Sequence, residues 1–155
     1  MHNRNKKIEN FFVAYESLFN RILADENNEC IDAIIDLSSS CFIESNPHIV
    51  TCGKCDELIK RTKESFIRYK NNGIKNAAIY SKEIIPLDDY HAMVKVQWHF
   101  SSSDNEVLIL NIIYLLRTIQ KDIKIFGYIS GDEYKAMKNA EEMRASQEKE
   151  LVFDL

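Results

Sequence analysis

The sequence predicts an α+β fold in which amphipathic helices come first and a curved antiparallel sheet follows. Apolar residues recur at three- and four-residue spacing over residues 8–23 and again over 58–69, which is the period of a helix. Between residues 76 and 130 the period changes to two, over four successive segments. With 155 residues and 45% hydrophobic content the chain can bury one core, so a single cone-shaped domain is expected.

The first predicted element is a long helix over residues 8–23. Polar residues separate its apolar positions, which are Ile8, Phe11, Phe12, Tyr15, Phe19, Ile22 and Leu23. Residues 1–7 are expected to form a flexible N-terminus. No apolar stretch of the secretory kind, about 7–15 residues long, follows them, so a cytoplasmic protein is expected.

A second, shorter helix and a hairpin are predicted next. The polar break Asp25-Glu26-Asn27-Asn28 precedes the helix, whose apolar residues are Ile31, Ile34, Ile35 and Leu37. This helix is expected to end in Ser38-Ser39-Ser40. Residues 42–44 and 48–51 then flank Ser45-Asn46-Pro47, a sequence that favours a turn, so they are predicted to pair as strands.

The third helix presents Leu58, Thr62, Phe66 and Tyr69 on one face and stops at Asn71-Asn72-Gly73. Its other face is charged. Basic residues alternate there with Asp56, Glu57 and Glu64, which is typical of a solvated face; the basic residues are Lys60, Arg61, Lys63, Arg68, Lys70 and Lys75.

Four strands are predicted over residues 77–85, 90–100, 107–118 and 123–129. In the second, Ala92, Val94, Val96, Trp98 and Phe100 alternate with polar residues, so one face is buried. The third is apolar on both faces, which predicts a central strand covered by helices on one side and by a second sheet or subunit on the other.

A last helix is predicted from the capping box Ser130-Gly131-Asp132-Glu133 to about Lys149. Because this segment is charged all around, it is expected to be solvated or to pack only through Tyr134, Met137 and Met143. The expected domain therefore covers residues 8–130, and residues 131–155 form a C-terminal helix and tail.

The order of these elements resembles the nuclear transport factor 2-like superfamily, which includes SnoaL-like, ketosteroid isomerase-like and other cystatin-like proteins. The supporting stretches are Phe12-Val13-Ala14-Tyr15, Gly53-Lys54-Cys55-Asp56-Glu57-Leu58-Ile59 and Asp122-Ile123-Lys124-Ile125-Phe126-Gly127-Tyr128-Ile129-Ser130. Ile123 stands where the superfamily commonly has tryptophan. The resemblance covers about residues 8–134 and implies a ligand cavity between helices and sheet, and often a homodimer through the outer sheet face.

The resemblance also supplies candidate site residues. An ungapped comparison with ketosteroid isomerase places its aspartate base near Ser45 and its second acid near Ile113. Neither residue is ionisable, so that isomerisation is not expected here. If Ile113 points into the cone, then Ile109, Asn111, Leu115 and Arg117 share its face. The cavity candidates are Tyr15, Phe19, Ser45, His48, Asn111, Ile113, Arg117 and Tyr128.

Other acid–base arrangements of the superfamily use histidine, aspartate and tyrosine. This chain offers Asp36, His48, His91, His99 and Tyr128, although the alternation of the strand places His99 on the outer face. An isomerase, lyase or cyclase of SnoaL type would need an Asp–His or Tyr–His pair in the cavity. A non-catalytic interaction module with a filled cavity is the other alternative.

The Cys52-Gly53-Lys54-Cys55 motif has the form of a thiol–disulfide exchange site at a helix start. Such sites occur in a βαβ context, which the predicted order of elements lacks. Cys30, Cys41 and His48 have no metal-ligand spacing relative to this motif, so no metal is expected. The structural interpretation is that Gly53 supplies a turn and that one or both thiols pack beneath the third helix.

Composition excludes several other classes. The net charge of −4 provides no attraction to nucleic acid or anionic membranes. The sequence has no Gly-rich phosphate loop and no nucleophile elbow. We therefore expect a homodimeric protein without a cofactor that binds a small, largely apolar ligand.

Overall fold

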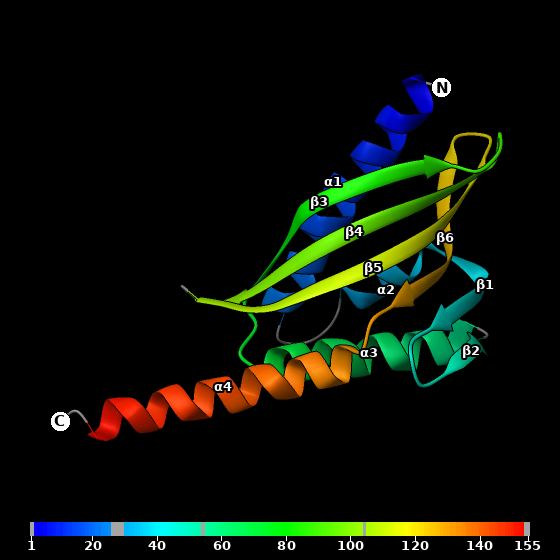
Figure 1. Cartoon of the computed structure of the whole chain (residues 1–155). Coiled ribbons are helices and arrows are strands. Elements are labelled where there is room, and N and C mark those ends of the chain that lie inside the picture. The colour runs from blue at the N-terminus through cyan, green and yellow to red at the C-terminus, as the bar shows by residue number, and fades with distance from the viewer. Residues whose placement is uncertain (1, 26–29, 54, 104, 154–155) are drawn as a thin grey trace.

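Six strands form one sheet in the order β2-β1-β6-β5-β4-β3 (Figure 1). The computed structural model describes residues 2–25, 30–53, 55–103 and 105–153. The strands are β1 (Ser38–Ser45), β2 (Val50–Gly53), β3 (Asn76–Pro86), β4 (His91–Ser102), β5 (Asn105–Ile119) and β6 (Asp122–Ser130). The helices are α1 (His2–Ala24), α2 (Ile31–Ile35), α3 (Cys55–Asn71) and α4 (Glu133–Phe153). The predicted α+β fold is confirmed.

One strand pair in the sheet is parallel. β1 and β2 pair as the antiparallel hairpin that the turn sequence predicts. β1 also pairs with β6, and this pairing is parallel, with a register shift between Ser38 and Ile43. The remaining neighbours are antiparallel. The hairpin therefore extends the sheet formed by the later strands, and the sheet is mixed.

The inner face of the sheet packs against the helices. Trp98 and Phe100 of β4 are fully buried on this face, as the alternation predicts, and they contact the ring of Phe19 on α1. Phe66 and Tyr69 of α3 complete this aromatic cluster. Aromatic rings therefore fill most of the core between α1, α3 and the sheet.

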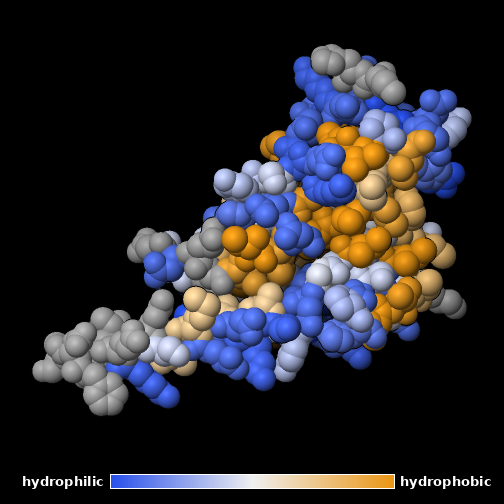
Figure 2. Space-filling model, in the orientation of Figure 1, coloured by the Kyte–Doolittle hydropathy of each residue, from blue (hydrophilic) through white to orange (hydrophobic). Residues whose placement is uncertain are grey.

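The outer face of the sheet carries an apolar patch. The β5 side chains of the outer face run beside Ile129 on β6 and Ile43 on β1, because Ile113 pairs with Ile129 and Leu115 with Gly127. Ile43, Ile129 and Ile109 are 41–45% exposed. Figure 2 shows apolar residues gathered over β5, β6 and β1. We call Ile43, Ile109, Ile113, Leu115 and Ile129 the outer patch.

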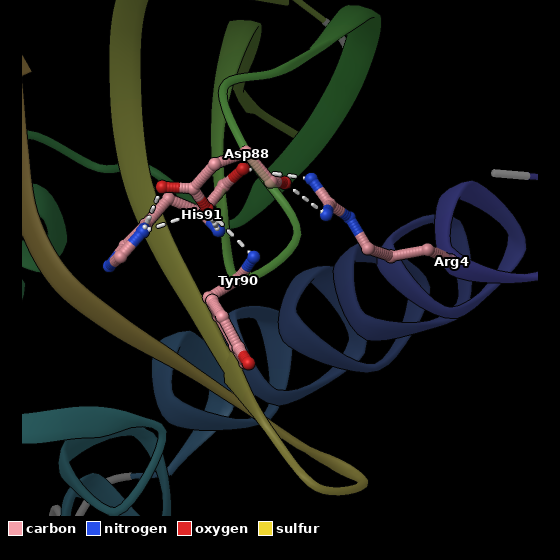
Figure 3. Close-up of polar contacts among 4 residues, drawn as sticks. All are labelled: Arg4, Asp88, Tyr90 and His91. Atoms are coloured by element: carbon pink, nitrogen blue, oxygen red, sulfur yellow. Dashed lines mark hydrogen bonds and ion pairs between the residues drawn. The ribbon is translucent and has the colours of Figure 1, made fainter.

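α1 begins at His2, so residues 2–7, which we expected to be flexible, are helical. The Arg4 guanidinium donates hydrogen bonds to the carbonyl oxygens of Asp88 and His91 in the β3–β4 loop (Figure 3). The Asp88 carboxylate in turn accepts the backbone N–H of Tyr90 and of His91, each at 2.7 Å. This loop therefore anchors the first turn of α1.

α1 also covers the edge of β3. The Asn20 side chain donates to the Ala77 carbonyl at 2.7 Å and accepts the Ala77 N–H at 2.8 Å. The Glu16 carboxylate accepts the N–H of Ile79 at 2.6 Å. These side chains replace a neighbouring strand and protect the edge from further pairing.

α2 ends at Ile35, earlier than the predicted stop at the three serines. Ser38, Ser39 and Ser40 lie in β1, so the prediction of a helix end there is wrong. α2 has only five residues, too few for helix propensity alone to stabilise it. The packing of its buried isoleucines therefore holds it in place. Of the predicted polar break, residues 26–28 lie outside the described residues.

α3 and α4 lie side by side (Figure 1). The α3 face with Leu58, Phe66 and Tyr69 is buried as predicted, and Gly73 follows the helix with φ +73°. α4 packs through Met137 and Ala140, and Arg144 donates to the Asn72 carbonyl at 2.5 Å. The prediction that Tyr134 and Met143 pack is wrong, because they are 71% and 65% exposed.

None of the described helices is both long enough and apolar enough to cross a lipid bilayer.

Candidate functional site

A cavity of about 90 Å³ lies between the helices and the inner face of the sheet. Its volume is roughly three times the share that one water molecule has in the liquid, so it is small. Most of the wall is aliphatic or aromatic. The polar lining consists of four tyrosines, two glutamates and one arginine, with small hydroxyl side chains beside them: Tyr15, Tyr69, Tyr114, Tyr128, Glu44, Glu133, Arg61, Ser38, Thr62 and Ser65.

A line of polar groups connects the core to this cavity. The indole N–H of Trp98 donates to the Tyr114 hydroxyl at 3.0 Å. Burial raises the pKa of Tyr15 to about 12. A hydrogen bond with Tyr114 acts in the opposite direction but is the smaller effect. Burial also raises the pKa of Tyr114. Both phenols therefore keep their protons at neutral pH and can hydrogen-bond a ligand in apolar surroundings.

Glu133 brings a carboxyl group into this cavity from the first position of α4. Burial raises its pKa, although the Tyr69 hydroxyl donates to it at 3.2 Å and Arg68 is a favourable positive charge. Glu133 therefore holds its proton to higher pH than an exposed glutamate does. A buried carboxyl with a raised pKa is a candidate for acid–base chemistry.

The second carboxylate of the cavity, that of Glu44 on β1, forms an ion pair with an arginine. Arg61 of α3 forms an ion pair with Glu44 at 3.1 Å and donates to the Thr51 hydroxyl. Burial and the negative charge of Glu44 raise the pKa of the neighbouring Tyr128. One wall of the cavity thus holds an acid in a direct ion pair, whereas Glu133 forms no direct ion pair among the described residues and Arg68 acts on it from a greater distance.

His48 lies outside the cavity and contacts the start of α4. Its Nε2 is 2.7 Å from the Asp132 carboxylate, and 67% of its side chain is exposed. Asp132 also accepts the N–H of Lys135, which makes Asp132 the N-cap of α4. These two interactions lower the pKa of Asp132, the Lys135 backbone first. The helix begins at Glu133, so the predicted capping box at Ser130 is replaced by this cap.

The structure brings together three of the eight cavity candidates. Tyr15, Phe19 and Tyr128 line the cavity. Ser45 ends β1 beside the hairpin turn, and the backbone N–H of His48 in that turn bonds to the Asn46 side chain. Ser45 and His48 are not among the lining residues of the cavity.

Asn111, Ile113 and Arg117 lie on the outer face of the sheet, opposite the cavity. The residues of β5 that face inward are the buried Leu108, Leu110, Ile112, Tyr114 and Leu116. The expectation that Ile113 points into the cone is therefore wrong. Side chains alternate along a strand, so an alignment error of one residue exchanges the two faces.

None of the described histidines lines the cavity. His91 Nδ1 is 2.8 Å from the Asp88 carboxylate in the β3–β4 loop, and hydrogen bonds from His91 and from two backbone N–H groups lower the pKa of Asp88 to about 2. His99 stacks on Tyr80 at 4.4 Å on the outer face, which confirms its predicted side. Asp36 caps α2. The cavity contains a Tyr–Glu pair where a SnoaL-type enzyme was expected to have a histidine pair.

The first thiol of the cysteine motif does not pack beneath α3. Cys52 is an exposed free cysteine on β2, which excludes the packing of both thiols and leaves the packing of one as the prediction. Lys54 lies outside the described residues. Among the residues that the structure describes, no group of three His, Cys, Asp or Glu side chains could hold a metal ion.

Several polar residues of the cavity were not predicted as site residues, among them Glu44, Arg61, Tyr114 and Glu133. Glu44 lies two residues after the buried Phe42 and therefore on the same face of β1, so strand periodicity could have placed it inside. Arg61 was assigned to a solvated face, yet it is three positions from Leu58, within one helical turn of the buried face. Glu133 carried no separate signal, because a glutamate at a helix start is ordinary.

Solved structures with the same fold match most of the chain. An NTF-2 like protein of unknown function from Shewanella oneidensis MR-1 is 18% identical with a TM-score of 0.65, over 83% of this chain and 99% of the other. A ketosteroid isomerase-like protein from Erwinia carotovora atroseptica SCRI1043 is 20% identical with a TM-score of 0.56, over 80% and 92%. A cystatin-like protein of unknown function from Nostoc punctiforme PCC 73102 is 12% identical with a TM-score of 0.58, over 81% and 89%.

At these identities the structural matches show the fold alone. No curated protein matches the chain. The family profile described as NTF2-like protein (DUF6841) matches residues 5–133, which include α1 from its fourth residue, α2, α3, the six described strands and the first residue of α4. The chain therefore belongs to the DUF6841 family of NTF2-like proteins.

Proposed function

We propose that this protein binds a small, largely apolar molecule that carries one hydrogen-bonding group. The observation that supports the proposal is the cavity between helices and sheet, with an apolar wall and buried polar groups. Tyr15, Tyr114 and Glu133 place two hydroxyls and a carboxyl in surroundings poor in water. Polar groups in such surroundings gain most from a partner that water does not supply.

The size of the cavity limits the ligand. About 90 Å³ holds a short chain or a small ring, and a larger molecule requires the rings of Tyr15 and Phe19 to rotate. The same small volume is the observation that favours the alternative of a filled interaction module. A binding experiment with small probes therefore separates the two functions.

Trp98 provides a reporter for this experiment. It is the single tryptophan of the chain, and its indole N–H bonds to Tyr114 beside the cavity. We expect phenol to shift the indole N–H resonance in a ¹H–¹⁵N spectrum and toluene, which has the same shape without the hydroxyl, to bind more weakly. Tyr15→Phe should reduce this preference for phenol, whereas Tyr80→Phe on the exposed outer face should not.

If neither probe shifts the Trp98 resonance up to its solubility limit, the ligand-binding proposal is wrong. Ile112→Phe provides a further test, because it reduces the cavity volume from the sheet side. Loss of the phenol response in Ile112→Phe and its persistence in Tyr80→Phe would localise binding to the cavity.

A specific observation also favours proton-transfer chemistry as a second candidate. Glu133 has a raised pKa and lies beside the Tyr69 hydroxyl, so an acid–base group and a hydrogen-bond donor are adjacent. Such a pair could move a proton next to a carbonyl group. We expect the protein to exchange the α-protons of cyclopentanone with deuterated water, and Glu133→Gln to abolish the exchange. Equal rates with and without protein would exclude this activity for that substrate class.

We also propose that two copies pair through the outer patch. Ile43, Ile109 and Ile129 leave over two-fifths of their surface exposed on one sheet face. Contiguous exposed apolar surface of this kind is typical of an interface. This pairing would cover the second face of β5, whose apolar residues predict cover on both sides.

A further inference from the structure

A second, wider groove opens on the outer face of the sheet and adjoins the cavity, with which it shares Ser38 and Phe42. Its volume is about 900 Å³. One wall is the first half of β1, where Ser38, Ser39 and Ser40 precede the register shift against β6. The floor consists of the adjoining ends of β4, β5 and β6. A groove of this volume is in the range of sites for small organic molecules.

Three basic side chains cross the floor of this groove in one row. His91 on β4 is directly opposite Arg117 on β5, and Arg117 is directly opposite Lys124 on β6. Like charges at directly opposite positions repel each other. The Asp88 carboxylate compensates His91 at 2.8 Å. The row therefore favours an additional negative group at its other end.

Arg117 and Lys124 have no carboxylate partner in the described part of the chain. Lys124 donates to the carbonyl oxygen of Asp36, which carries no charge. Asp122 shares the outer face of β6 with Lys124 but forms no ion pair with either cation within the described residues. Arg117 is exposed. Two positive charges, one of them a planar guanidinium suited to carboxylates, thus face the groove.

Apolar side chains continue from this charged end. The ring of Phe126 lies edge-on to His91 with centroids 5.9 Å apart, and Ile119 and Ile43 are 47% and 41% exposed. An inorganic anion would pair with Arg117 and Lys124 but leave these apolar side chains exposed to water. An anion with an apolar chain would cover both.

We propose that this groove binds an organic monocarboxylate with an apolar chain. The carboxylate lies between Arg117 and Lys124, and the chain lies along Phe126 toward Ile43. The serine hydroxyls of β1 form the opposite polar wall. Arg117 and Lys124 are not lining residues of the cavity, so the proposal does not depend on the function proposed for the cavity.

The test uses octanoate as the carboxylate probe and isothermal titration calorimetry on the full chain. Octan-1-ol keeps the chain without the charge, and acetate keeps the charge without the chain. We expect octanoate to bind more tightly than both. Arg117→Gln and Lys124→Gln should each weaken octanoate binding about tenfold, the usual effect of losing one charge-assisted hydrogen bond.

Lys95→Gln is the matched control, because Lys95 is a cation on the outer face that already pairs with Glu83 and lies outside the groove. Its affinity for octanoate should equal that of the wild type. Equal binding of octan-1-ol, an equal loss in Lys95→Gln, or loss of octanoate binding in Tyr15→Phe would each overturn the proposal. A change of oligomeric state in Arg117→Gln without any octanoate binding by the wild type would assign the groove to subunit packing instead.

Discussion

Gly127 is the residue at which the sheet tolerates no side chain. A Cβ at this position would lie 2.8 Å from the Ile43 carbonyl oxygen of β1, a backbone atom that cannot rotate away. The parallel pairing of β1 with β6 therefore depends on a glycine. The chain offers a matched comparison in Gly131, where a Cβ meets nothing within 4 Å.

We predict that Gly127→Ala destabilises the protein by about 1–3 kcal/mol, the usual cost of overpacking. Gly131→Ala should leave the free energy of unfolding within about 0.5 kcal/mol of the wild type. Urea denaturation of the three proteins measures both. Equal stability of Gly127→Ala and the wild type would mean that β1 does not approach β6 as closely as described.

Glu133 has a pH-dependent effect on stability. Because burial raises its pKa in the folded protein, the folded state binds this proton more tightly than the unfolded chain does. This tighter proton binding stabilises the folded protein fully at pH values below the pKa of the glutamate in the unfolded chain, about 4.3. The stabilisation is lost as the pH rises through the higher pKa that Glu133 has in the folded protein. Glu133→Gln is neutral at every pH and can still accept the Tyr69 hydrogen bond.

We therefore predict that Glu133→Gln melts a few degrees above the wild type at about pH 8, and that this advantage shrinks toward about pH 4. Thermal unfolding followed by circular dichroism across this pH range tests it. Glu141→Gln, on an exposed position of the same helix, should show no such pH dependence. An advantage that grows toward low pH would contradict the assigned pKa direction.

At the scale of elements, side chains of α1 form hydrogen bonds with the backbone of β3, which is the edge strand of the sheet. Asn20 pairs with both backbone polar groups of Ala77, so removing its side chain leaves an N–H and a carbonyl without these partners. We predict that Asn20→Ala costs about 1–3 kcal/mol of stability. It should also accelerate amide hydrogen exchange in β3.

The control for this prediction is Asn10→Ala, the same substitution on an exposed position of the same helix. It should change stability and exchange little. Fast exchange in β3 of both variants would mean that α1 as a whole, and not the Asn20 side chain, protects the strand.

The elements themselves could largely be predicted from the sequence, whereas the cavity could not. The alternation of Trp98 and Phe100 with polar residues placed the inner face of β4 correctly. On β5 both faces are apolar, so nothing local distinguished Ile112 from Ile113, and the inner residue was assigned wrongly. The pairing of Glu44 with Arg61 joins β1 to α3, and such tertiary partners leave no periodic signal in a single sequence.

At the scale of the whole molecule, the outer patch predicts the oligomeric state. Ile113 lies at its centre, opposite Ile129. We predict that the wild type is a dimer in solution and that Ile113→Lys is a monomer, because a lysine cannot be buried there without a partner charge. Light scattering coupled to size-exclusion chromatography distinguishes the two.

The matched control is Val13→Lys, which places the same charge on an exposed position of α1, on the helical side of the sheet and away from the outer patch. This variant should remain a dimer. A monomeric wild type would contradict the proposed pairing.

The parallel pairing of β1 with β6 also constrains when the protein can fold. β1 is made early in synthesis, but its partner in the sheet is the last strand to leave the ribosome. Until then β1 has only β2 as a neighbour, and the contact that joins this hairpin to the sheet is between segments far apart in the sequence. The complete sheet can therefore form only after β6 has left the ribosome, and the nascent chain exposes the edge of β1 until then.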